Sequence, residues 1–148
     1  MAEFVMKDLV NKAGLSDNFA IDSAATSNEE IGNDVHPGTK RTLEKHGVPY
    51  GRHRARRMTS AEYADWDYII AMDEENLRGL ASILGHWNDY YKDPAITLPE
   101  LDTENKIKLL MEYAGQSRDV ADPWYTGNFD ATWNDVYSAC NMLLEAIL

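Results

Sequence analysis

The order of segments along the chain limits its fold more than any other feature of the sequence. Helical patterns alternate with short apolar strand patterns, and the first pattern is a helix at residues 1–13, followed by Gly14 as a natural stop. This alternation predicts an α/β fold with an open parallel sheet and helices on both faces. A doubly wound domain normally begins with a strand, and the turn after that strand binds phosphate. Here the helix is present without the strand and turn that would precede it.

Three short apolar segments predict the strands of the sheet. They are FAIDSA (19–24), DYIIAM (67–72) and KIKLLMEY (106–113). Residues 86–105 contain Pro94 and Pro99, so we expect this stretch to be mostly loop.

Capping residues predict where the later helices begin and end. The signals are Pro37 and Gly47 for helix 37–46, Thr59 and Glu62 for a short helix before Trp66, and Asp73 for helix 74–84. We expect a last helix at about 130–147, capped by Asp130. Its buried face would contain residues at helical spacing: Trp133, Val136, Tyr137, Cys140, Leu143, Leu144 and Ile147.

The composition favours a single cytoplasmic domain formed by residues 1–148. No apolar run is long enough for a membrane span, and Glu3 and Asp8 make the N-terminus unlike a signal peptide. The net charge of −11 argues against a nucleic-acid partner. The one cysteine, Cys140, allows no internal disulfide and no cysteine-based metal site. It lies within the last predicted helix, so we interpret it as a buried structural residue.

Positive charge is concentrated in one segment. Residues 40–57 hold seven of the 14 Lys and Arg residues against a single acid, Glu44. This segment is either a solvated helix with the strand that follows it, or the source of a field that helps to hold an anion.

Four segments together resemble the low-molecular-weight protein tyrosine phosphatases over essentially the whole chain. They are DSAATSNEEIGN (22–33), DYIIAMDEENLRGL (67–80), DVADPWYTGNFDATW (119–133) and, more loosely, HGVPYGRHRARRMT (46–59). The opening MAEFVMKDLV is similar to the helix that follows the family's phosphate loop. The resemblance implies that a phosphorylated protein or a small aryl phosphate is hydrolysed through a phosphocysteine intermediate, without a metal or other cofactor.

The family's C-x5-R-S/T loop and first strand have no counterpart in this sequence, so we expect an N-terminally truncated domain that is inactive as written. It is either a shortened product or mis-started gene reading of a working phosphatase, a pseudophosphatase that binds or regulates, or a fragment completed by another chain. In the family the absent strand lies between the strands matching 19–24 and 67–72. Its absence would leave a gap in the sheet, and we expect one of three outcomes. The neighbouring strands shift and close the gap, a second chain fills it (for example a second copy of this chain, through self-association), or the domain is only partly stable.

The resemblance assigns the general acid to Asp122. A phenolate leaving group needs a proton as its bond to phosphorus breaks, and a partly shielded carboxylic acid can supply it. Trp124 and Tyr125 would flank the substrate ring, and Glu29 occupies a place where many members have an aromatic wall. From the residues alone, Asp-Pro also begins a turn, and the two aromatic rings could belong to the core.

Three further residues match supporting positions of the family. Ser23 and His53 resemble residues that hydrogen-bond the back of the phosphate loop, although a one-residue insertion leaves Arg52 as an alternative to His53. His53 could equally be an ordinary surface residue. Asp73 resembles a residue beside the active site, but capping a helix is a sufficient role for it.

Overall fold

The computed structural model describes residues 1–86 and 94–148. Its elements, in order, are α1 (Ala2–Lys12), η1 (Ser16–Asn18), α2 (Pro37–Lys45), η2 (Ser60–Asp65), β1 (Ile69–Ala71), α3 (Glu74–Gly85), α4 (Pro94–Leu101), β2 (Ile107–Leu109), η3 (Leu110–Ala114), α5 (Pro123–Thr126) and α6 (Phe129–Ile147). Strands alternate with helices only in the middle of this order, from β1 through α3 and α4 to β2, which is a shorter alternation than the sequence predicts.

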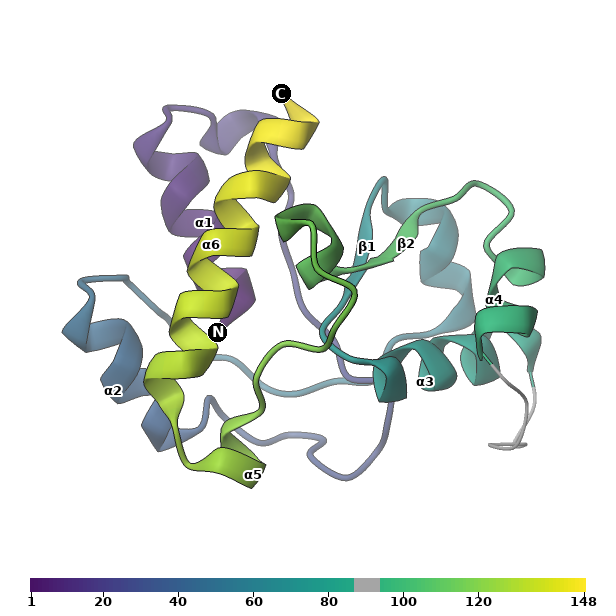
Figure 1. Ribbon diagram of the computed structural model, residues 1–148, viewed down its shortest axis with the longest axis horizontal. Helices are drawn as coiled ribbons and strands as arrows, with labels where there is room; N and C mark the ends of the chain where they lie inside the picture. Colours follow the sequence, from purple (N-terminus) through teal and green to yellow (C-terminus); the bar gives the residue numbers. More distant parts are fainter. Residues whose placement is uncertain (87–93) are drawn as a thin grey trace.

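The sheet consists of β1 and β2, which pair in parallel with Ile69 opposite Ile107. Successive side chains of β1 point to opposite faces. Ile69 and Ala71 pack into a cluster with side chains of α3 and α4, whereas Ile70 and Met72 pack against a cluster formed mainly by α1 and α6. Figure 1 shows the sheet between these two groups of helices. The expected α/β fold with helices on both faces is confirmed.

The larger apolar cluster lies where α1 packs along α6. Val5 and Val10 of α1 meet Val136, Ala139 and Cys140 of α6, and all five side chains are almost fully buried. Tyr137 was expected in this core, but it is 44% exposed. Its ring stacks on Trp133 with centroids 5.3 Å apart, at the solvent side of the helix.

The predicted caps of two helices are confirmed. At the start of η2, the N–H and the hydroxyl of Thr59 both donate to the Glu62 carboxylate, at 2.7 and 3.2 Å. Asp73 accepts a hydrogen bond from the backbone N–H of Asn76, 2.7 Å away, at the start of α3. Local hydrogen bonding therefore sets where these segments begin.

The predicted strand 19–24 is wrong. These residues form no strand, and the nearest ladder contact is a lone parallel bridge between Ala25 and Arg57. Among the described residues, the backbone of 19–24 makes no hydrogen bond to another strand. A strand exists only where a neighbouring strand satisfies its N–H and C=O groups, and the apolar pattern alone cannot supply that partner.

Three boundaries also differ from the sequence prediction. Part of the expected loop 86–105 is helix α4, since Pro94 suits a first helical position and Leu98 is buried against α3; residues 87–93 lie outside the described part. The strand predicted at 106–113 ends at Leu109, after which η3 buries Leu110. Helix α6 is capped by Asn128, whose side chain accepts from the N–H of Ala131, so Asp130 lies in the first turn instead.

Within residues 1–86 and 94–148, no helix has the length and apolar character needed to cross a membrane.

Candidate active site

The segment around Asp122 forms a short turn of helix on the surface. The Asp122 carboxylate caps α5 by accepting a hydrogen bond from the N–H of Trp124 at 2.9 Å. Gly127 ends α5 in the left-handed conformation, at φ 65°. The side chains of Trp124 and Tyr125 are 76% and 88% exposed. Asp-Pro does begin a turn here, but the interpretation of the two rings as core residues is wrong.

The chain just before Asp122 is fixed to α6 by polar contacts. Asp135 accepts two hydrogen bonds from the Arg118 guanidinium, at 2.7 and 2.8 Å, and a third from the N–H of Ala121 at 2.9 Å. Arg118 lowers the pKa of the Asp135 carboxyl, against the opposing effect of partial burial. The Thr132 hydroxyl donates to the Ala121 carbonyl at 2.6 Å. Asp122 therefore follows a residue held on both its N–H and its C=O.

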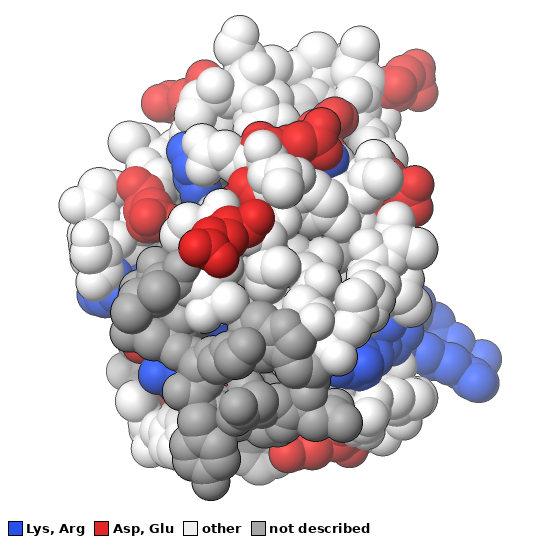
Figure 2. Space-filling view, turned by 90° about the vertical axis from the view of Figure 1, so that its right-hand side faces the viewer, with Lys and Arg blue, Asp and Glu red and all other residues white. Residues whose placement is uncertain are grey.

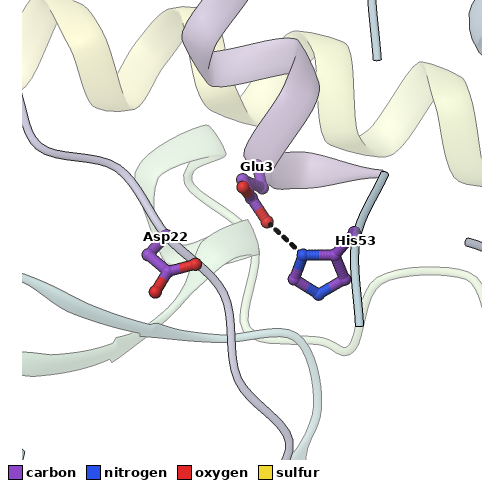
Figure 3. Close-up of side chains that lie close together, drawn as sticks. All are labelled: Glu3, Asp22 and His53. Carbon is purple, nitrogen blue, oxygen red and sulfur yellow. Dashed lines mark ion pairs between the residues drawn. The ribbon is translucent and has the colours of Figure 1, made fainter. Parts of the chain in front are cut away.

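A second polar cluster gathers Glu3, Ser23 and His53 from segments far apart in the sequence. Figure 3 shows Glu3 and His53 of this cluster together with Asp22. The Glu3 side chain is only 6% exposed and pairs with Lys7 at 2.6 Å. Ser23 donates its hydroxyl to Glu3, and His53 places Nδ1 3.5 Å from the same carboxylate. The Ser23 Oγ lies 3.4 Å from His53 Nε2. The structure thus brings Ser23 and His53 together and adds Glu3, which the sequence analysis missed.

Glu3, Asp22 and His53 are also the group within residues 1–86 and 94–148 that could offer three ligands to a metal, since their ligand atoms lie within 4.8 Å of one another. Each of these groups already has a protein partner. Asp22 pairs with Arg56 at 2.9 Å. Partial burial raises the pKa of Asp22, but the N–H of Ser23 and the Arg56 guanidinium outweigh that effect, so the pKa lies below its usual value. The donors are therefore engaged in a network of ion pairs, and we assign no metal here.

The chain is similar in sequence and in structure to proteins of one known family. The sequence profile described as "Low molecular weight phosphotyrosine protein phosphatase" matches residues 1–148.

The chain belongs to the low-molecular-weight protein tyrosine phosphatase family.

Its relatives are bacterial and animal members of that family. It is 36% identical to the low molecular weight protein-tyrosine-phosphatase YfkJ of Bacillus subtilis, covering 99% of this chain and 86% of the relative. It is 34% identical to the human low molecular weight phosphotyrosine protein phosphatase, covering 100% and 84%. The crystal structure of YfkJ superposes with a TM-score of 0.82 at 35% identity, over 99% of this chain and 84% of that one. The structure of DARP, a drosophila arginine phosphatase, gives 0.78 at 26% identity, over 99% and 87%.

Cys140, the one cysteine of the chain, is unsuited to attack phosphorus. Cys140 is buried on α6, and burial raises the pKa of its thiol to about 12. A nucleophilic cysteine needs the opposite, an exposed thiolate with a lowered pKa. Cys140 is therefore a core residue, in agreement with the interpretation from sequence.

The remaining predicted site residues make no polar contact with Asp122 within the described part of the chain. Asp73 acts as the cap of α3, and Glu29 is exposed. Among the described residues, no hydrogen bond or ion pair connects Asp122 with Ser23 or His53.

Three of the seven basic side chains of the segment 40–57 pair with neighbouring acids in the described part of the structure. Figure 2 shows the face of the molecule on the right of Figure 1, where Lys and Arg lie in several separate places and acidic side chains form small groups. The ion pairs of the basic segment are Lys40–Asp34 at 2.8 Å, Lys45–Asp130 at 3.1 Å, Arg56–Asp22 at 2.9 Å and Arg56–Glu62 at 2.7 Å. Arg41, Arg52, Arg54 and Arg57 form no ion pair among the described residues, so both interpretations of the segment remain predictions.

Proposed function

We propose that this domain contributes the general-acid half of a phosphotyrosine phosphatase site, with Asp122 as the proton donor. The observation that carries the proposal is the Asp122 turn itself, which is anchored to α6 beside two exposed aromatic rings. A half-buried carboxyl on a fixed turn can reach the oxygen of a bound aryl phosphate. Trp124 and Tyr125 supply apolar surface for a substrate ring, which suits an aromatic phosphomonoester.

We further propose that residues 1–148 do not turn over phosphate esters by themselves. Covalent hydrolysis in this family uses a cysteine thiolate and an arginine in one phosphate loop, and Cys140 is buried with a raised pKa. No other cysteine is present in the sequence. The Glu3–Ser23–His53 cluster resembles the support for such a loop and contains no cysteine.

The two parts of this proposal can be tested with two proteins. The first is the chain of 148 residues, assayed with p-nitrophenyl phosphate alongside Cys140→Ser. We expect no turnover above the uncatalysed rate in either protein. Turnover that disappears in Asp122→Asn would refute the claim that the chain alone is inactive.

The second protein is a chimera in which the first strand and C-x5-R-S/T loop of a relative precede Met1. General acids contribute roughly 10²–10⁴-fold to such rates, so Asp122→Asn should lower kcat by about that factor. The loss should be larger for phenyl phosphate than for p-nitrophenyl phosphate, because p-nitrophenolate leaves without needing a proton as much. Asp130→Asn, an exposed acid on the first turn of α6, is the matched control and should leave kcat unchanged. Equal losses for both substrates would exclude a general-acid role.

A pseudophosphatase that binds phosphoproteins is the second candidate. The burial of Cys140 favours it, because binding needs no nucleophile. A phosphotyrosine peptide should then bind to the chain of 148 residues, with affinity reduced in Trp124→Ala and unchanged in Asp122→Asn. Absence of binding at millimolar peptide would dismiss this candidate.

A further inference from the structure

His36 connects the start of α2 to the turn that carries Asp122. Its Nδ1 accepts a hydrogen bond from the N–H of Gly38 at 3.0 Å, so the imidazole is the cap of α2. The ring lies nearly parallel to Phe129, with centroids 5.5 Å apart and an interplanar angle of 21°. It meets Trp124 nearly edge-on, at 5.7 Å and 65°. Both separations are in the range favoured for interacting aromatic rings.

The two aromatic partners of His36 lie within the Asp122 turn and directly after it. Trp124 follows Asp122 by two residues, and Phe129 is the first residue of α6. The approach of α2 to this junction requires a glycine. A Cβ added at Gly38 would lie 2.2–2.7 Å from atoms of the Phe129 ring. Residues from α2, α5 and α6 therefore close together around one imidazole, near the N-terminal end of α6 (Figure 1).

The contacts of the turn differ on its two sides. Before Asp122, Ala121 is fixed to α6 by Asp135 and Thr132. After Asp122, the polar contacts of the turn with the described residues are local, from the N–H of Trp124 and the hydroxyl of Thr126 back to Asp122. The His36 ring adds a contact from a distant segment to this second side.

We propose that His36 is a positioning residue that holds Trp124, and through it the Asp122 turn, against α2. This inference rests on the proposed function for the meaning of Asp122 as an acid, but the positioning itself needs no catalysis. The imidazole has two separable roles. Its nitrogen caps a helix, which an asparagine oxygen can also do, and its ring packs on Trp124, which a phenylalanine ring can also do.

Fluorine NMR of the chain labelled with 5-fluorotryptophan separates these roles. Trp124→Phe and Trp133→Phe identify the two relevant resonances. We expect His36→Asn to keep α2 folded and to move the Trp124 resonance at least halfway to its unfolded position. We expect His36→Phe to leave that resonance near its original position, because the ring is retained. The matched control is His46→Asn at the other end of α2, whose ring stacks on Trp133 at 3.9 Å. It should move the Trp133 resonance and leave that of Trp124 in place.

Two results would overturn the inference. A Trp124 resonance unchanged in His36→Asn would reduce His36 to a helix cap. A resonance displaced in His36→Phe as far as in His36→Asn would mean that ring packing does not hold the turn. Neither measurement depends on turnover, so a failure of Asp122→Asn to slow the chimera would refute the acid role and leave this test unaffected.

Discussion

Asp135 offers the sharpest test of how the Asp122 turn is held. In Asp135→Asn, one oxygen can still accept from the N–H of Ala121, but an NH₂ group replaces the oxygen that accepts from the Arg118 Nη2 at 2.7 Å. Hydrogen bonds to charged groups contribute about 1.5–3 kcal/mol. The Arg118 side chain is 45% exposed, and solvent weakens its interaction with Asp135. We therefore expect Asp135→Asn to lower the free energy of unfolding by about 1.5–2 kcal/mol, near the lower end of that range.

That loss should be visible in thermal unfolding followed by circular dichroism at neutral pH. For a chain of this size, each kcal/mol lowers Tm by roughly 2–4 °C, so we expect Tm to fall by about 3–8 °C. Asp130→Asn is the matched control on the same helix. Its pair with Lys45 is 65% and 62% exposed, so the effect should stay below about 1 kcal/mol.

The pH dependence gives this prediction a second arm. Because Arg118 lowers the folded pKa of Asp135, its contribution to the free energy of unfolding is complete above the unfolded aspartate pKa of about 3.9. The contribution disappears as pH falls through the folded pKa. The difference between wild type and Asp135→Asn should shrink over that acidic window. A Tm loss no greater than that of Asp130→Asn, or one that is independent of pH, would refute the assignment of Asp135 as the anchor of the turn.

Three further predictions concern other parts of the molecule. The Lys40 ammonium, with backbone N–H groups, lowers the pKa of Asp34 to about 2; an NMR titration should find this midpoint, and Lys40→Gln should raise it. Cys140 should resist iodoacetamide in the folded protein at pH 8 and react once urea unfolds it, because burial raises the pKa of its thiol to about 12; fast labelling of the folded protein would contradict its burial. Gly79→Ala should destabilise the fold by about 1–3 kcal/mol despite the better helix propensity of alanine, since the new Cβ would lie 2.4 Å from the Cβ of Thr26; an increase in urea midpoint would show that Thr26 moves aside freely.

The elements that sequence analysis predicted correctly are those set by nearby residues. The capping box of η2 and the Asp73 cap of α3 join residues three apart, so the signal and its effect lie in one short segment. The strand at 19–24 failed because its existence depends on a partner elsewhere in space. Helix α4 was missed because Pro94 and Pro99 are ordinarily loop signals, and only the burial of Leu98 against α3 outweighs them.

The candidate site shows the same division. Asp122 and its exposed rings follow from a compact motif that one segment of sequence carries. Glu3 and His36 were missed because their partners lie in other segments. A signal did exist for Glu3, since it shares the face of α1 with Met6 and Val10 at helical spacing, and a carboxylate on an apolar face needs a partner. Little in the sequence indicates that His36 caps α2, because histidine is not among the residues preferred at the start of a helix.

The separation of the apolar side chains into two clusters has a consequence for how the molecule opens. Only two strands of three residues each divide the α1–α6 cluster from the α3–α4 cluster. Cooperative units of local unfolding tend to follow such supersecondary groupings. Amide hydrogen exchange should therefore resolve two foldons, with α3 and α4 losing protection together while α1 and α6 remain protected. Glu74 of α3 donates its N–H to Asp119 at 3.0 Å. Opening of the α3–α4 unit would therefore release one contact of the segment before Asp122, while the contacts of Ala121 with Asp135 and Thr132 of α6 remain.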